Sequence, residues 1–193
     1  IQILVQLPLM RRLGYSLVPH FHFRDPLVRR VLRQWLPVVA TASIFTVNQQ
    51  VALFFASGLE DGSSSALTNA LTFFQLPFGI FAASVTTVLF PRMSRQSAEG
   101  DLPGLKETVS FGLRYLVVLL IPSGVLLGLI GTETISVALQ RGAFETRHTI
   151  LAGRVLAGYC IGLFSVGAFN FLQRFFYSRD NYRVPLIAAG LTV

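Results

Sequence analysis

Four long stretches without a charged residue constrain this chain more than any other feature. Each is about as long as, or longer than, the roughly 20 mostly apolar residues that a helix needs to cross a bilayer. A helix of a soluble protein rarely goes so far without a charge, because one of its faces meets water. The four stretches are Gln34–Leu59, Gly62–Pro91, Tyr115–Thr132 and Val155–Gln173. They predict a polytopic helical membrane protein rather than a large soluble core.

The composition agrees with this prediction. Charged residues make up 13% of the 193 residues, against about 25% in ordinary soluble domains. Apolar residues make up 52%, and the mean hydropathy is +0.60. These values exclude a disordered tail and a small disulfide scaffold. The single cysteine, Cys160, lies in an apolar run without a nearby metal-ligand partner, and we expect it to be a core residue.

We therefore predict an all-α fold, a polytopic transmembrane helix bundle with four full spans and a partial span at each end. The full spans are expected at about 35–57, 65–90, 107–131 and 150–173, and the partial ones at about 1–9 and 184–193. Residues 1–34 would hold a helix end and a basic cytoplasmic segment, and residues 35–193 the bundle. Because residue 1 is Ile and both ends are apolar, the chain is expected to be a fragment.

Most Lys and Arg residues fall in three alternate loops. Since cytoplasmic loops are enriched in these residues, we place the three loops inside and those near Glu60 and Glu133 outside. The net charge of +7 then indicates topology and contact with anionic membrane lipids, not nucleic acid. The residues are Arg11, Arg12, Arg24, Arg29, Arg30 and Arg33, then Arg92, Arg95 and Lys106, then Arg174, Arg179 and Arg183.

Polar residues inside the predicted spans are the best clues to function, because such residues usually face a bundle interior or a water-filled cavity. The first full span contains Asn48 and Gln49. The second carries Thr68, Thr72 and Gln75 at positions i, i+4 and i+7, which share one helix face. We name these three residues the polar stripe. Both groups are candidates for lining a substrate cavity; interhelical hydrogen bonding is the alternative for the first.

Proline and glycine positions predict where the helices bend or approach closely. Pro77 removes a backbone hydrogen bond just beyond the polar stripe, with Gly79 beside it, so we expect a helix bend. The bend would belong either to a moving, cavity-lining helix or to a static kink. Two GxxxG patterns, Gly124–Gly128 and Gly158–Gly162, predict close helix packing.

Arg114, near one end of the third span, allows two interpretations. Its side chain either reaches back to the membrane interface or adds a cationic lining that attracts an anionic substrate. No Asp, Glu or His lies in the charge-free stretches. We therefore predict no catalytic residues, no metal site and no cofactor, and a protein that is not an enzyme.

Residues Gln75–Asp101 read QLPFGIFAASVTTVLFPRMSRQSAEGD. This stretch resembles the MurJ/MviN family of lipid II flippases, within the multidrug/oligosaccharidyl-lipid/polysaccharide exporter superfamily. Further matches are Phe176–Asp180, Phe23–Asp25 and Arg29–Pro37. The matching positions of the first stretch are Gln75, Leu76, Pro77, Gly79, Pro91, Ser94, Arg95, Gly100 and Asp101.

The resemblance implies a helical protein with two lobes around a cationic cavity, of which this chain holds most of the second lobe. It implies a multi-pass protein of the bacterial cytoplasmic (inner) membrane that moves lipid II, a lipid-linked anionic substrate, by alternating access. The cell-wall synthesis machinery would be a partner. Alternatives are an exporter of another lipid-linked polysaccharide or of drugs on the same fold, and a non-transporting membrane scaffold.

One position departs from the family pattern. The family typically carries an Arg five residues before the motif proline, and this chain has Thr72 there. The positive charge of the cavity would then come from another position, for example Arg114.

Overall fold

The structure is a computed structural model that describes residues 26–60, 62–139 and 146–191. The chain divides into two compact units, Ile1–Leu36 and Pro37–Val193. The described residues of both units form helices and no strands, which confirms the predicted all-α class. The expected partial span at residues 1–9 and the first part of the basic segment lie outside the described residues.

The helices are longer than the predicted spans. Helix α2 begins at Pro26, inside the segment expected to precede the first full span. The second span consists of α3, a π-helical segment η1 and α4, and the fourth of α6 and α7. The elements are α2 (Pro26–Ser57), α3 (Ser63–Pro77), η1 (Phe78–Ala82), α4 (Ala83–Glu99), α5 (Leu102–Leu139), α6 (Thr146–Ile161), α7 (Leu163–Ser178) and α8 (Arg183–Gly190).

Three helical stretches are long and apolar enough to cross a membrane: Val31–Ser57, Ser63–Glu99 and Leu102–Leu139. The bent pair of α6 and α7, which meet at an angle of 48°, makes a fourth if it forms one span. These lengths and compositions fit the predicted polytopic helical bundle.

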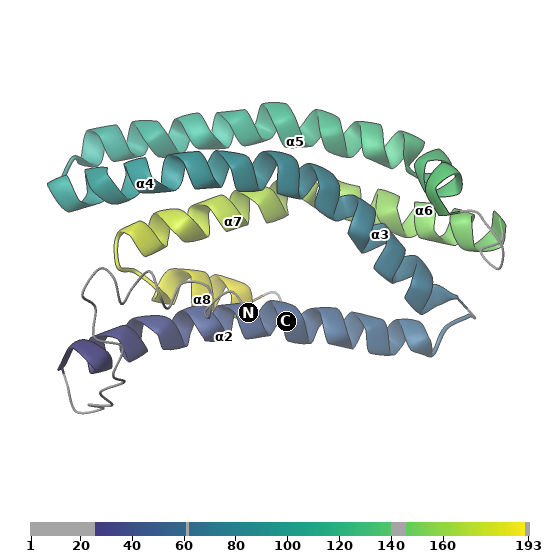
Figure 1. The fold of residues 1–193 in the computed structure, drawn as a ribbon, viewed down its shortest axis with the longest axis horizontal. Coiled ribbons are helices and arrows are strands. Elements are labelled where there is room, and N and C mark those ends of the chain that lie inside the picture. The colour runs from purple at the N-terminus through teal and green to yellow at the C-terminus, as the bar shows by residue number, and fades with distance from the viewer. Residues whose placement is uncertain (1–25, 61, 140–145, 192–193) are drawn as a thin grey trace, which may run out of the picture. The chain divides into compact units, whose positions relative to one another are not determined.

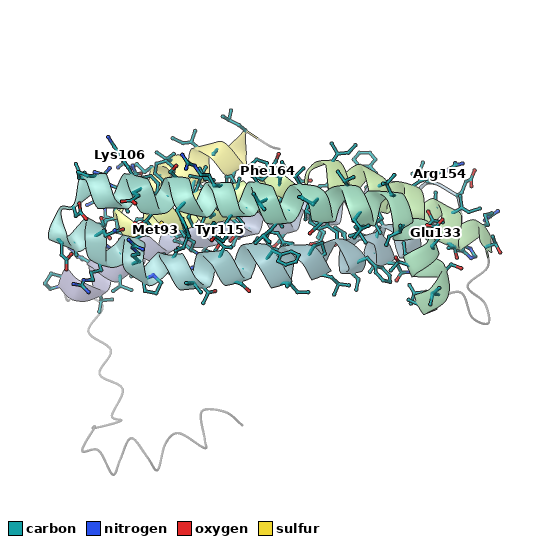
Figure 2. The ribbon with its side chains drawn as sticks, turned by 90° about the horizontal axis from the view of Figure 1, so that it is seen from above. Met93, Lys106, Tyr115, Glu133, Arg154 and Phe164 are labelled. Atoms are coloured by element: carbon teal, nitrogen blue, oxygen red, sulfur yellow. The ribbon has the colours of Figure 1, made fainter. Side chains whose placement is uncertain are left out.

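Helix α5 runs past two pairs of helices within the second unit (Figure 1). Helices α4 and α7 pack against each other and against one half of α5, while α6 packs against its other half and α3 packs on α6. Met93 and Lys106 lie near one end of this arrangement and Glu133 and Arg154 near the other (Figure 2). We call the end of α4, α5 and α7 that contains Lys106 the basic end.

Glycines allow α5 to approach its neighbours closely. A Cβ atom added at Gly124 would lie 3.0 Å from the carbonyl oxygen of Cys160, and one at Gly131 would lie 2.9 Å from Leu156 Cδ2. In a bilayer, helices associate mainly through such close packing, since lipid is as apolar as their side chains. The first GxxxG prediction is therefore confirmed at Gly124. The second is wrong at Gly158, which faces open space.

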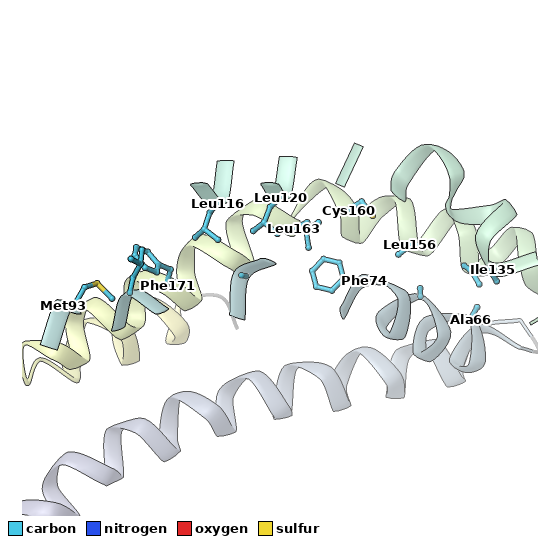
Figure 3. Close-up of a cluster of buried hydrophobic side chains, with 14 of the residues drawn as sticks. Ala66, Phe74, Met93, Leu116, Leu120, Ile135, Leu156, Cys160, Leu163 and Phe171 are labelled. Atoms are coloured by element: carbon cyan, nitrogen blue, oxygen red, sulfur yellow. The ribbon is translucent and has the colours of Figure 1, made fainter. Parts of the chain in front are cut away.

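A continuous apolar cluster fills the space between these helices (Figure 3). Phe171 and Leu163 of α7 and Leu156 of α6 are completely buried in it. Cys160 is 8% exposed and belongs to the same cluster, which confirms its predicted place in the core. The outward face of α5, by contrast, carries exposed apolar side chains: Leu129 is 75% and Val118 is 68% exposed. Such large exposed apolar side chains suit contact with lipid chains rather than water.

The path from α3 to α4 changes helix type directly after Pro77. The π-helical segment Phe78–Ala82 contains Gly79, and the ribbon turns between α3 and α4 there (Figure 1). Buried residues recur every four positions along α3, at Ala66, Ala70 and Phe74. This spacing exceeds the 3.6 residues of an α-helical turn, so the buried face drifts around the helix. A π turn contains more residues than an α turn, so each residue rotates the chain by a smaller angle. The π-helical segment therefore offsets part of the drift of the buried face before α4 begins.

Candidate functional site

The polar stripe lies on the exposed face of α3. Thr68, Thr72 and Gln75 are all exposed, while the opposite face of α3 packs on α6. The Thr68 hydroxyl donates to the carbonyl oxygen of Ser64 at 2.9 Å, and the Thr72 hydroxyl donates to that of Thr68 at 3.0 Å. Each hydroxyl proton is therefore satisfied within the helix, and the oxygen lone pairs remain available to water or to a ligand.

The amides of α2 are also exposed. Asn48 and Gln49 both lie at accessible positions of the helix. The ring of Phe45, one turn earlier, lies 5.5 Å from the ring of Phe169 on α7. Within the described residues α2 has no extensive packing against α3. The structure therefore does not join the α2 amides and the polar stripe into one packed site.

Arg114 is exposed on the half of α5 that packs against α4 and α7. The polar stripe instead belongs to α3, which packs on α6, and α3 makes little direct contact with α5. No hydrogen bond or ion pair between described residues connects Arg114 to the stripe. The assignment of Arg114, the α2 amides and the stripe to one substrate cavity stays a prediction.

A second polar region, which the sequence did not predict, lies between α4 and α7. Its cavity measures about 370 Å³ and we name it the α4–α7 pocket. The Arg174 guanidinium carbon lies 5.7 Å from the centre of the Phe90 ring. The hydroxyl of the buried Thr86 donates to the carbonyl oxygen of Ala82 at 2.7 Å. The lining residues are Ala83, Thr86, Thr87, Phe90, Pro91, Asn170 and Arg174.

Sequence reasoning missed this pocket because it requires two helices that are distant in the chain. Arg174 was expected in a cytoplasmic loop, but it lies on α7, which continues to Ser178. Asn170 inside a charge-free stretch and its spacing of four residues from Arg174 were available signals, since such residues share a helix face. Nothing in the sequence indicated that this face would meet α4.

Polar contacts also hold the basic end together. The buried Thr108 hydroxyl of α5 donates to Gln96 Oε1 of α4 at 2.9 Å. The Gly104 amide donates to Asp101 Oδ1 at 3.0 Å, which caps the start of α5. Gly100 ends α4 with a φ of 74°, a conformation that favours glycine. Among the described residues, no three His, Cys, Asp or Glu side chains gather closely enough to hold a metal ion.

These observations define a class of protein: a multi-pass helical membrane protein whose exposed surfaces are mainly apolar and are interrupted by a polar helix face and a cationic pocket. The family model described as "Lipid II flippase MurJ" matches residues 1–193. The chain therefore belongs to the MurJ lipid II flippase family.

Individual relatives agree with this membership. The chain is 31% identical over 179 residues to a "Probable lipid II flippase MurJ" of Borreliella burgdorferi, covering 93% of this chain and 35% of the relative. It is 28% identical over 193 residues to one of Buchnera aphidicola, covering 100% and 38%. It is 26% identical over 198 residues to the "Lipid II flippase MurJ" of Burkholderia cenocepacia, with the same coverage. The chain thus spans about a third of the length of these curated relatives.

Proposed function

We propose that this protein translocates lipid II, the lipid-linked peptidoglycan precursor, across the bacterial cytoplasmic membrane by alternating access. Membership of the family supports this function, as do the names of the relatives. The observation within the molecule that carries the proposal is the polar stripe. It consists of three exposed hydrogen-bonding side chains on a helix whose other face is packed in an apolar bundle.

The physical task of a flippase explains why such a surface is needed. Moving a carboxylate-sized ion from water into hydrocarbon costs on the order of 20 kcal/mol in an idealised estimate. A path lined with hydroxyl and amide groups replaces part of the lost hydration of a charged head group. The amides of Gln75 on α3 and of Asn48 and Gln49 on α2 would supply N–H donors to the anionic groups. The Thr68 and Thr72 hydroxyls, whose protons are used within the helix, would instead accept hydrogen bonds from the sugar hydroxyl groups.

The interruption after Pro77 would allow the lining helix to change shape. Broken helices are common near the binding sites of transporters, because irregular backbone is tolerated where it lines a cavity. In the proposed cycle α3 and α4 change their mutual angle at η1, where Gly79 leaves open space around the backbone. No covalent step is required, so the protein would act as a transporter and not as an enzyme.

The substrate supplies a pyrophosphate, and the cavity must supply a cation to attract it. Thr72 is neutral at a position where the family typically has Arg, so we propose that Arg114 contributes positive charge in the assembled cavity. The proposed partners are the lipid-linked anionic substrate, the surrounding membrane lipids and the cell-wall synthesis machinery.

Depletion of the full-length protein in its own bacterium tests this function, with lipid II translocation to the outer leaflet as the readout. We expect translocation to stop and to return when the wild-type gene is restored. Normal translocation after depletion, in a strain without a second flippase, would contradict the proposal. We expect the Thr72→Arg variant to restore translocation, because an added cation favours the pyrophosphate. Failure of a normally inserted Thr72→Arg protein would show that this cavity does not accept a cation at position 72, which would contradict a place for the polar stripe beside the pyrophosphate.

A further inference from the structure

We propose that the α4–α7 pocket binds the phosphate group of an anionic phospholipid in the cytoplasmic leaflet. The pocket is separate from the polar stripe, which lies on α3 and belongs to the part of the bundle that packs on α6. The inference goes beyond translocation, since it assigns a membrane phospholipid, and not the transported lipid, to this pocket.

The guanidinium group of Arg174 in this pocket has N–H donors available for a ligand. Arg174 is exposed and contacts the face of the Phe90 ring through its guanidinium group. In the part of the chain that the structure describes, no hydrogen bond or ion pair joins it to a carboxylate. A guanidinium group carries five N–H donors arranged in a plane, which is more than a contact with one ring can use. Two parallel N–H bonds to one phosphate are the geometry that arginine favours.

The ion pair between Arg95 and Glu99, near the C-terminal end of α4, lies outside the pocket. Arg95 Nε lies 2.8 Å from Glu99 Oε1, so the charge of this carboxylate is already matched by another arginine. Neither residue lines the pocket. The pocket therefore presents a net positive charge, which favours an anion over a zwitterion.

Neutral donors complete the site. Asn170 lies one turn before Arg174 on the same face of α7, and Thr87 is exposed on the facing helix α4. An asparagine amide offers two N–H donors and a threonine hydroxyl offers one. The proton of the neighbouring Thr86 is already used within α4. A phosphate held by Arg174 thus has further donors available for its remaining oxygens.

The size and surroundings of the pocket favour a lipid over a free phosphate ion. About 370 Å³ is at the lower end of the roughly 300–1,000 Å³ of ligand pockets. Phe90, Pro91 and Ala83 add apolar surface beside the polar groups. The pocket belongs to the basic end, which the distribution of Lys and Arg predicts to be cytoplasmic. Basic pockets between helices at that depth are typical sites for anionic lipid head groups.

Lipid binding to the full-length protein in detergent micelles tests the proposal, with native mass spectrometry as the readout. The probes are phosphatidylglycerol, phosphatidylcholine and undecaprenyl pyrophosphate. We expect one phosphatidylglycerol to bind in preference to phosphatidylcholine. We expect Arg174→Gln to weaken its binding about tenfold, because charged hydrogen bonds are lost. The matched control is Arg179→Gln, which removes the same charge from the end of α7 outside the pocket.

The other results would overturn the proposal. Equal loss in the Arg174→Gln and Arg179→Gln proteins would mean that general surface charge, not the pocket, holds the lipid. Unchanged phosphatidylglycerol binding by Arg174→Gln would exclude the site. Preferential, Arg174-dependent binding of undecaprenyl pyrophosphate would assign the pocket to the transported lipid instead. The Asn170→Leu variant is a second test, because it removes a neutral donor and leaves every charge in place. It should also weaken phosphatidylglycerol binding.

Discussion

Two surfaces of the bundle differ in what their residues do. At the interface between α5 and α6 small residues allow close packing, whereas the exposed face of α3 carries polar side chains. At the first, glycines such as Gly124 and Gly131 remove side chains so that neighbouring atoms come to about 3 Å of an added Cβ. At the second, the side chains of Thr68, Thr72 and Gln75 remain exposed, and among the described helices theirs packs mainly on α6 through its other face. Close packing therefore joins the helices of the bundle, and we expect the exposed polar face to contribute little to its stability.

A side chain added at the glycine-lined interface should have the largest effect. In Gly124→Val the new Cβ would meet the Cys160 carbonyl, and because backbone cannot rotate away, α5 and α6 must separate. We expect a loss of roughly 1–3 kcal/mol or more from the free energy of unfolding. The measurement is thermal unfolding of the full-length protein in detergent.

Gly158→Val is the matched control for this experiment. Gly158 is the first glycine of the other GxxxG pattern, and an added Cβ there meets nothing within 4 Å. Equal destabilisation by both variants would mean that the close contact at Gly124 is not the cause of the loss, since valine has a higher helix propensity than glycine at both positions.

Removal of the buried hydrogen bond between α4 and α5 should have an intermediate effect. Gln96→Leu leaves the Thr108 hydroxyl without its partner in a buried place, which costs about 1–3 kcal/mol. The double variant with Thr108→Val should recover part of this loss, since both polar groups are then absent. Thermal unfolding of the two single variants and the double variant measures the coupling. Strictly additive losses would contradict a direct bond.

Substitution on the polar stripe should have the smallest effect on stability. Thr72→Cys in a Cys160→Ala background should shift the free energy of unfolding by no more than about 0.5 kcal/mol, because the side chain is exposed. Its thiol should react with a small aqueous reagent, whereas Ala70→Cys on the packed face should not. Absence of labelling at Thr72→Cys would favour a dry, non-transporting scaffold.

Much of the fold followed from the sequence because the bilayer imposes simple rules. Charge-free stretches of about 20 residues have the length of a membrane-spanning helix, and a helix satisfies the hydrogen bonds of its backbone within the segment itself. Pro77 marked the place where the second span changes helix type, because proline cannot donate a backbone hydrogen bond. Of the two GxxxG patterns, however, only the first lies at a close contact, and the motif by itself could not distinguish them.

The candidate site was harder to predict from the sequence than the fold. The polar stripe was visible because its members belong to one helix and repeat with the helical period. The α4–α7 pocket was not visible, because Phe90 and Arg174 come from helices separated by the whole of α5 and α6. A single sequence contains no signal for which faces of two distant helices will meet.

The sequence by itself thus determined that this chain is a membrane-spanning helical protein and which family it belongs to, and it marked Pro77, after which the second span changes helix type. These properties depend on local hydrophobicity, on backbone hydrogen bonding and on a continuous motif. Only the tertiary structure decided that Gly124 is a contact and Gly158 is not, and that Arg174 shares a pocket with α4. Both outcomes depend on the packing of helices against one another, which is set by the shapes of whole surfaces and not by any one segment.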